Sequence, residues 1–297
     1  MPHADPQALA DTLRWKPELL VQFRDGLAAR LKQRPDDPEL LRQVAWLCRA
    51  AGDLAAARDA CERLLAQDPG DREVLHHATV LRGEPEPGLF DPRAAMMPPF
   101  VYRTGFLPDD AVAALWEAVV ALAPHFRPSG VEWYGKRSVD TDVRQSLTAL
   151  ADDRVRALVL EPARAMIARE RLAERLGVRV TPGGAVMTQV HCHREADHFK
   201  AHRDGDEENL QHRELTFVYY FHRTPKRFRG GDLLMYDAGL ERDVLYNPMR
   251  FTRVAPAHNS ILFFPSRALH EVAPVSCSSD DLLDGRLTVT GWMARED

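Results

Sequence analysis

Histidines are concentrated in the second half of the chain, and some of them lie beside carboxylates at short spacing. The sequence has 12 histidines, and eight of them fall within residues 191–270. Two histidines and one carboxylate leave open positions on one face of Fe(II), as O₂ activation with a bidentate co-substrate requires. The usual sequence form is His-x-Asp with a distant histidine. His202-x-Asp204 and His3-x-Asp5 both have this form, and chance alone provides about one, so context must decide.

The context of His202-x-Asp204 is long and ordered. Four further blocks follow the motif along the chain: 213–221, 230–236, 259–275 and 285–292. Together with the segment before the motif, this series (residues 188–293) strongly resembles the double-stranded β-helix core of the 2-oxoglutarate- and Fe(II)-dependent dioxygenases, in their prolyl 4-hydroxylase-like branch. The resemblance covers about a third of the chain, and five blocks in the right order are far more specific than any one of them.

The resemblance implies a metal centre and a reaction. Carried over to this sequence, the family pattern makes His202, Asp204 and His270 the ligands of Fe(II). It implies that 2-oxoglutarate and O₂ are consumed, that succinate and CO₂ are released, and that the substrate is hydroxylated, with ascorbate (vitamin C) in support. Halogenating relatives replace the carboxylate ligand with a small residue, so Asp204 indicates hydroxylation.

The last strand-like block carries a co-substrate contact. Alternation along a strand puts Arg286, Thr288 and Trp292 on one face. An arginine that points into a barrel needs an anionic partner, and a guanidinium grips a carboxylate with two parallel hydrogen bonds. The resemblance assigns Arg286 to the distal carboxylate of 2-oxoglutarate and Tyr220 to the same group. We expect Thr216, which shares a face with Tyr220, and Thr288 to line the co-substrate site.

The strand that precedes the motif departs from the family. Many members have a tyrosine nine or ten residues before the first ligand, where this chain has His191-Cys192-His193. Co-substrate or substrate contacts from this strand therefore stay open, and these histidines are more typical of cavity-lining or solvent-facing residues than of iron ligands. Our candidate substrate contacts are His191, Trp292, Tyr134 and Arg144. A tryptophan at position 292 is more often plain core than part of a substrate pocket. The segment 133–144 could equally be a substrate-covering loop or an exposed connection.

A competing ligand set is conceivable but fits less well. His212-x-Glu214 would need His258 as its distant histidine. It precedes a strand in which Thr216 and Tyr220 already fit the other register, so we favour the set that contains His202.

An internal repeat precedes these blocks. Residues 31–40 and 65–74 align at a shift of 34 residues, which is the tetratricopeptide period. The segment 38–69 resembles one complete tetratricopeptide repeat. Asp37 is a suitable N-cap for its first helix, and Asp71 for the helix that follows the repeat. Further helices are expected at about 16–33 and 72–81.

Proline density and a change of pattern divide the chain. We expect a tetratricopeptide-like helical region at 1–84, a proline-rich linker at 85–99 and the dioxygenase domain at 100–297. Helical periodicity is found at about 108–123 and 152–176. Strand-like segments then follow one another without intervening helices: 178–180, 185–192, 215–221, 232–236, 260–264 and 286–292. The fold class is therefore α+β, a jelly-roll core with flanking helices after a small all-α region.

Composition limits the remaining possibilities. A formal net charge of −5 gives no reason to expect a nucleic-acid or membrane partner. The longest stretch without charge, 180–193, is short of the roughly 18–20 residues of a membrane helix. Four cysteines without paired spacing and an N-terminus without a secretory pattern favour the cytoplasm.

The leading hypothesis is hydroxylation of a residue in a peptide or protein, with proline as the first guess because the resemblance lies in that branch. The repeat region also favours a polypeptide substrate. One alternative is a hydroxylase of a free amino acid or small metabolite. Another is a non-catalytic adaptor in which the repeats bind a partner and the barrel senses iron or 2-oxoglutarate.

Overall fold

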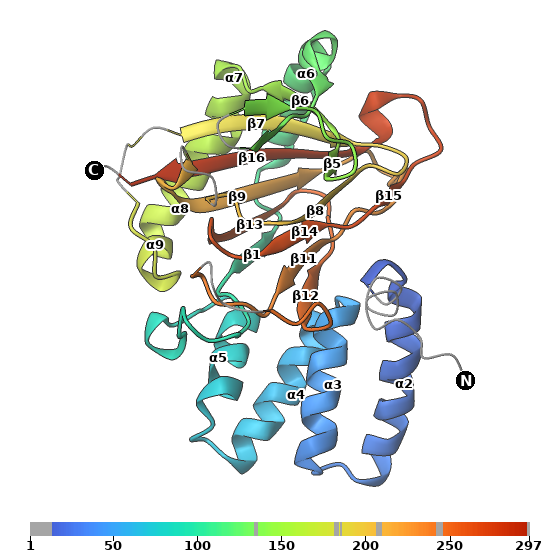
Figure 1. The fold of residues 1–297 in the computed structure, drawn as a ribbon, viewed down its shortest axis with the longest axis vertical. Coiled ribbons are helices and arrows are strands. Elements are labelled where there is room, and N and C mark those ends of the chain that lie inside the picture. Colours follow the sequence, from blue (N-terminus) through green and yellow to red (C-terminus); the bar gives the residue numbers. More distant parts are fainter. Residues whose placement is uncertain are drawn as a thin grey trace. The chain divides into compact units, whose positions relative to one another are not determined.

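The computed structural model describes the chain over residues 14–133, 136–180, 184, 186–205, 210–241 and 246–295 (Figure 1). It divides into two compact units. Unit 1 comprises Met1–Pro99 and Leu234–Val254, and unit 2 comprises Phe100–Leu233 and Ala255–Asp297. Within the described ranges, no helix combines the length and the apolar content that crossing a membrane requires.

Unit 2 is organised around a sheet of seven strands in which every neighbouring pair is antiparallel. In order across the sheet they are β1 (Val101–Thr104), β13 (Ser260–Pro265), β9 (Arg213–Phe221), β16 (Arg286–Ala294), β7 (Val186–His193), β6 (Leu147–Leu150) and β2 (Arg127–Pro128). Antiparallel sheets of this kind match the jelly-roll expected from the sequence.

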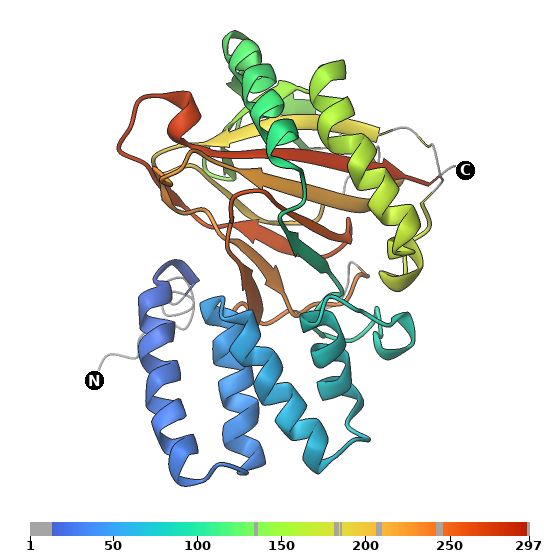
Figure 2. The ribbon, with the colours of Figure 1, turned by 180° about the vertical axis from the view of Figure 1, so that it is seen from behind.

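The two faces of this sheet differ in chemistry. On β9, β16 and β7 one set of alternating residues is apolar and belongs to the main hydrophobic core: Leu215, Phe217, Tyr219, Phe221, Leu287, Val289, Val190 and Cys192. Helices α6 (Asp109–Leu122) and α8 (Glu161–Arg169) contribute to the same core and lie across this outer face (Figure 2). The alternate residues therefore point to the other, inner face.

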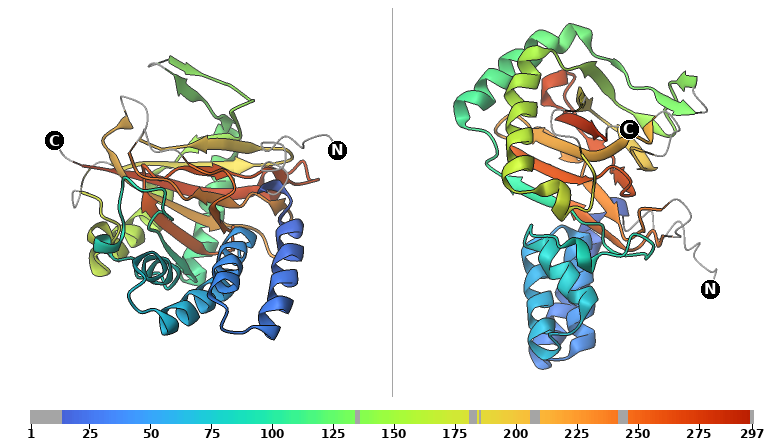
Figure 3. Two further views of the ribbon diagram at one scale, coloured as in Figure 1. Left: turned by 60° about the horizontal axis from the view of Figure 1, so that its bottom comes forward. Right: turned by 90° about the vertical axis from the view of Figure 1, so that its left-hand side faces the viewer.

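Shorter elements complete unit 2. The remaining short helices of unit 2 are η2 (Ala123–His125), α7 (Asp153–Val155), η3 (Arg156–Leu160), α9 (Leu172–Arg175) and η5 (Leu282–Asp284). A second set of antiparallel strands consists of β14 (His270–Val272), β8 (His198–His202) and β5 (Arg144–Gln145). Two strand pairs are β10 (Arg229–Gly230) with β15 (Val275–Ser276), and β3 (Val131–Trp133) with β4 (Lys136–Ser138). The β3–β4 pair projects from the rest of unit 2 (Figure 3).

Unit 1 begins with antiparallel helices that share one core. They are α2 (Pro17–Gln33), α3 (Pro38–Ala51), α4 (Leu54–Gln67) and α5 (Arg72–Leu81), followed by η1 (Pro87–Leu89). The expected caps are confirmed: the Asp37 side chain accepts a hydrogen bond from the Leu40 amide, and Asp71 accepts one from Val74. Gly52 ends α3 with φ +86°, a conformation that suits glycine.

Unit 1 also contains a segment from the second half of the chain, with β11 (Leu233–Tyr236) and β12 (Phe251–Val254). Helix α3 packs on it through buried polar contacts. Arg49 forms a fully buried ion pair with Asp237 and donates from Nε to the Thr252 hydroxyl at 3.0 Å. Arg253 donates from Nε to the Ala50 carbonyl at 2.9 Å, and the Trp46 indole donates to the Met249 carbonyl at 3.2 Å. The helical region and residues 234–254 are thus one folded body.

Most of the expected elements are confirmed, with two kinds of correction. The segment 178–180 is not a strand, so that expectation was wrong. Several strands were missed because they are short or rich in polar residues, and they include β8 and β14, which carry two of the candidate ligands.

Replacing Arg49 with methionine should destabilise unit 1. The change removes the partner of a buried carboxylate, and an uncompensated buried charge costs about 3–5 kcal/mol. Urea unfolding followed by circular dichroism measures this loss. Arg42→Met is the matched control, because Arg42 pairs with Asp71 at the surface and such pairs contribute about 1 kcal/mol or less. Equal losses for the two variants would contradict the prediction.

Candidate metal centre and co-substrate site

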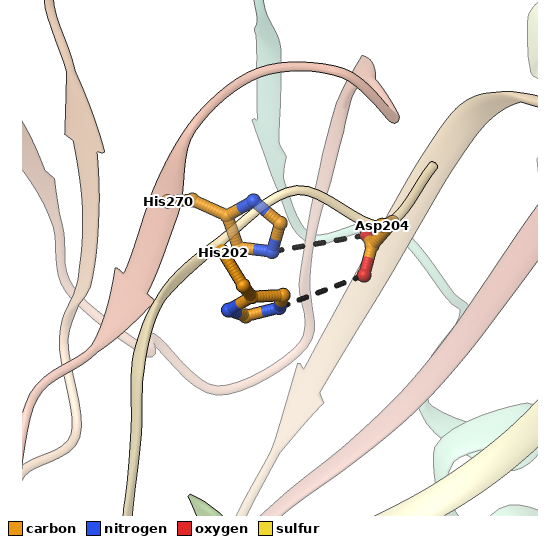
Figure 4. A group of neighbouring side chains, drawn as sticks. All are labelled: His202, Asp204 and His270. Carbon is orange, nitrogen blue, oxygen red and sulfur yellow. Dashed lines mark ion pairs between the residues drawn. The ribbon is translucent and has the colours of Figure 1, made fainter. Parts of the chain in front are cut away.

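His202, Asp204 and His270 converge in unit 2 (Figure 4). His202 ends β8, His270 begins β14, and the two residues are directly opposite each other in the antiparallel register. The two carboxylate oxygens of Asp204 lie 3.6 Å from His202 Nε2 and 3.7 Å from His270 Nε2. One ligand atom from each residue lies within 4.8 Å of the others. Among the described residues, no other such group of histidine, cysteine and carboxylate side chains occurs.

Each histidine is oriented by its other ring nitrogen. His202 Nδ1 lies 2.8 Å from the Lys200 carbonyl, and His270 Nδ1 lies 2.9 Å from the Ala268 carbonyl. Because a carbonyl only accepts, each Nδ1 carries a hydrogen, and it is Nε2 of each ring that faces the Asp204 carboxylate and would supply a lone pair to a metal. Lone pairs and a carboxylate that face one another repel unless a cation lies among them. The donor set therefore fits a divalent metal of the 2-His-1-carboxylate class.

Protonation states agree with metal binding. Burial opposes ionisation of Asp204, but the adjacent His270 and His202 hold its pKa well below the ordinary value. Burial and the neighbouring His202 lower the pKa of His270 to about 4. At neutral pH the carboxylate is ionised and the His270 lone pair is available.

The carboxylate of Asp204 is held by the hydroxyl of Thr216, which in turn contacts a serine hydroxyl. Thr216 Oγ1 donates to Asp204 Oδ2 at 2.8 Å and lies 2.9 Å from the Ser266 hydroxyl. The Asp204 amide donates to the Ser266 carbonyl at 2.9 Å. We expected Thr216 to line the co-substrate site. In the structure its hydroxyl instead contacts the carboxylate of Asp204, the candidate metal ligand. Ser266 was missed by sequence reasoning, since a serine just after a strand carries no distinctive signal.

His202 is also held from the side by an aromatic ring. Phe199 stacks on it with ring centroids 3.5 Å apart and planes 17° apart. The guanidinium carbon of Arg144 lies 4.6 Å from the centre of the Phe199 ring. Arg144 is the cross-strand neighbour of Phe199, so strand pairing builds this stack.

Arg286 is a buried cation on the inner face of the large sheet. Its side chain is 2% exposed, and Nε donates to the Gly231 carbonyl at 2.5 Å. No ion pair joins it to a carboxylate among the described residues. A Cβ on Gly231 would lie 2.5 Å from Arg286 Cδ, so the glycine leaves room for the arginine. A buried guanidinium without a carboxylate partner among the described residues is a suitable site for a ligand carboxylate.

Tyr220 and Thr288 are next to this arginine on the same face. The guanidinium carbon of Arg286 lies 5.2 Å from the centre of the Tyr220 ring, and Thr288 pairs across the strands with Tyr220 on one side and His191 on the other. Burial raises the pKa of Tyr220 well above its ordinary value, so the phenol keeps its proton as a donor.

Several buried polar atoms of the inner face have no hydrogen-bond partner within the described part of the chain. They are Tyr220 Oη, both ring nitrogens of His193, Trp292 Nε1 and Thr148 Oγ1. His193 pairs across the strands with Arg286. Unsatisfied polar atoms at this density are costly unless a polar ligand or water completes them.

Three of the four candidate substrate residues lie together. Arg144 Nη2 is 3.1 Å from His191 Nδ1, and the rings of His191 and Trp292 are 6.2 Å apart. The fourth, Tyr134, lies outside the described residues, as do His3 and Asp5. The competing ligands do not converge: Glu214 faces Arg267 and Arg295, whereas His258 contacts His222.

Comparison with known families agrees with this geometry. Residues 188–294 match the family model described as the 2OG-Fe(II) oxygenase superfamily, and residues 38–80 match a tetratricopeptide repeat model. The chain thus carries a 2OG-Fe(II) oxygenase domain and a tetratricopeptide repeat, as the sequence indicated.

Individual relatives were also found. An uncharacterised PKHD-type hydroxylase of Synechocystis sp. is 33% identical over 142 residues, which are 46% of this chain and 47% of that protein. The chain therefore spans about half the length of this curated relative. A prolyl-4-hydroxylase of Pseudomonas putida has a TM-score of 0.45 and 20% identity, covering 67% of this chain and 93% of that one. A prolyl hydroxylase of Trichoplax adhaerens, solved with a hypoxia inducible factor fragment, has a TM-score of 0.48 and 21% identity, covering 66% and 83%.

Replacing Thr216 with valine should weaken metal binding about 10- to 100-fold, as is common when the hydrogen bond to a ligand is lost. Titration with Mn(II), followed by electron paramagnetic resonance of the free ion, measures the affinity. Thr188→Val is the control, because Thr188 lies on the same sheet but its buried hydroxyl has no partner. An unchanged affinity in Thr216→Val would contradict a ligand-orienting role.

Proposed function

We propose that this protein is an Fe(II)- and 2-oxoglutarate-dependent dioxygenase that hydroxylates a residue, with proline as the first guess, in a peptide or protein. The observation that carries the proposal is the pairing of two features in one unit. One is the His202, Asp204 and His270 cluster with both Nε2 atoms aimed at the carboxylate. The other is the buried Arg286, which forms no ion pair with a carboxylate among the described residues.

Bound Fe(II) and 2-oxoglutarate would supply the oxidising power: O₂ is reduced, 2-oxoglutarate becomes succinate and CO₂, and one oxygen enters a substrate C–H bond. The protein's own contribution is positional. The histidines and Asp204 would hold the metal on three sides, and the Thr216 hydroxyl fixes the Asp204 carboxylate. Retention of that carboxylate favours hydroxylation, and the name of the Synechocystis relative also supports it.

The inner face would hold the co-substrate. Arg286 offers its guanidinium and Tyr220 its buried phenol to one carboxylate, as strong charge-assisted hydrogen bonds require. His193, the cross-strand neighbour of Arg286, offers a further ring N–H. Burial and Arg286 keep the pKa of His193 well below its ordinary value, so this ring is neutral and has one N–H to donate.

The choice between a polypeptide and a small substrate depends on the repeat. A tetratricopeptide repeat supports a polypeptide substrate. One observation favours the alternative of a free amino acid or small metabolite: the α3 residues Trp46 and Arg49 already bind residues 249–252 of the same chain. A peptide would then need another surface of the helical region.

The enzyme should release succinate from 2-oxoglutarate in the presence of Fe(II), ascorbate and O₂, slowly without substrate and faster with it. His202→Ala should abolish this release by removing a ligand. Succinate is quantified by liquid chromatography, and mass spectrometry of proline-containing peptides and of free proline detects one added oxygen. Absence of succinate with every substrate, together with absence of Fe(II) or Mn(II) binding, would refute the proposal.

Replacing Arg286 with glutamine should weaken 2-oxoglutarate binding about 10- to 100-fold, because a charged bidentate contact is lost. Calorimetric titration of 2-oxoglutarate into the Mn(II)-loaded protein measures this, and Mn(II) affinity itself should stay unchanged. Arg154→Gln serves as the control, since Arg154 pairs with Glu117 at the surface. Equal affinities in the two variants would remove Arg286 from the co-substrate site.

A further inference from the structure

The hydrogen bond between Arg144 and His191 fixes how His191 can interact with a ligand. A guanidinium only donates, so His191 Nδ1 must accept the hydrogen bond from Arg144 Nη2 at 3.1 Å. The ring is 4% exposed, and burial together with Arg144 lowers its pKa well below the ordinary value. His191 is therefore neutral and carries its proton on Nε2. The Nε2–H is thus the donor that this ring can offer to a ligand.

A second donor lies beside it on the same face. The Trp292 ring is perpendicular to the His191 ring, with centroids 6.2 Å apart. Trp292 is 8% exposed, and its buried Nε1–H has no acceptor among the described residues. Thr148, the cross-strand neighbour of His191, contributes a buried hydroxyl that is also without a partner. Nδ1 of His191 already accepts from Arg144, so His191 can offer a ligand only its Nε2–H, and the Trp292 indole and the Arg144 guanidinium are donors by nature. The group that binds these residues must therefore accept.

This donor cluster (His191, Trp292 and Arg144) adjoins the candidate metal ligands from two sides. Trp292 is the cross-strand neighbour of Thr216, whose hydroxyl binds Asp204. Arg144 lies over the Phe199 ring, which stacks on His202. Trp292 is six residues along β16 from Arg286, about 20 Å at strand rise. Within the donor cluster, Trp292 is thus far from the carboxylate contact assigned to Arg286, whereas His191 lies opposite Thr288, two residues from Arg286 along β16.

We propose that the donor cluster binds a carbonyl or carboxylate oxygen of the substrate and so holds the neighbouring C–H bond at the metal. This inference rests on the proposed function and specifies its substrate: the hydroxylated carbon is close to an oxygen acceptor. An internal peptide residue supplies a carbonyl, whereas a free amino acid or C-terminal residue supplies a carboxylate. Both are recognised by the same donors, and a substrate that presents only donors or a cation is disfavoured.

The test uses the full chain loaded with Zn(II) and saturating 2-oxoglutarate, so that no turnover occurs. The probes are N-acetyl-L-proline, which has a carboxylate, N-acetyl-L-proline methylamide, which has only carbonyls, and pyrrolidine, which has neither. We expect an oxygen-bearing probe to shift the Trp292 indole N–H resonance in ¹H–¹⁵N spectra. Tighter binding of the acid indicates a free carboxylate in the substrate, and equal or tighter binding of the amide indicates an internal peptide residue.

Calorimetry on variants tests the individual donors. Trp292→Phe keeps an aromatic ring and removes the N–H, and His191→Leu removes the other donor. Each should weaken the better probe about 5- to 10-fold, the usual effect of one hydrogen bond. Trp116→Phe is the matched control, because Trp116 packs on Phe221 of the outer face, and it should bind like the parent.

Three results would overturn the inference: equal affinity in Trp292→Phe and Trp116→Phe, pyrrolidine binding as tight as the oxygen-bearing probes, or no binding of either oxygen-bearing probe. Zn(II) and 2-oxoglutarate binding are measured first. If they bind and the probes behave in one of these ways, the substrate inference alone fails. If Zn(II) and 2-oxoglutarate do not bind, the proposed function fails and the inference fails with it.

Discussion

The register of the seven-stranded sheet is the constraint on which the candidate site depends. Because side chains alternate along a strand, one register sends Leu287 and Val289 into the core beneath the helices and sends Arg286 and Thr288 to the opposite face. A shift by one residue would bury the arginine among aliphatic side chains and expose the core. The apolar face therefore specifies the polar one. Hydrophobic burial under α6 and α8 fixes a buried cation, a phenol and histidine nitrogens that have no partner within the described part of the chain. At such buried positions each hydrogen bond to a ligand is stronger than in water.

The family resemblance, carried by the order and spacing of five sequence blocks, predicted the candidate ligands His202, Asp204 and His270, and the structure brings these three side chains together. Alternation predicted that Arg286, Thr288 and Trp292 share one face of their strand, and the structure places Leu287 and Val289 on the opposite, apolar face. The strands that bring the ligands together were not foreseen: β8 is five residues long with three basic or potentially basic side chains, and β14 has three residues. Such short polar segments become strands through their neighbours and not through intrinsic propensity.

The contacts among Arg144, His191 and Trp292 could not be predicted from the sequence. Each residue was singled out separately, but nothing along the chain indicates that β5, β7 and β16 bring them within reach of one another, since pairing between distant segments sets that proximity. The same holds for Thr216. Its place on the strand was foreseen, whereas its hydrogen bond to Asp204 depends on a loop two residues past β8. The sequence therefore predicted which residues belong to the site, but which of them contact one another could be learned only from the tertiary structure.

The segment 234–254 gives unit 1 a consequence for biosynthesis. Its helices are complete by residue 81, but the buried partners of Arg49, namely Asp237 and Thr252, are synthesised more than 150 residues later. At about 5–20 residues per second, the ribosome leaves the α3 surface without its partners for many seconds. During that interval Arg49 and Trp46 lack the partners that they have in the folded protein. We therefore expect the N-terminal helices to complete their packing only after residues 234–254 have been synthesised, although the helices themselves are synthesised first.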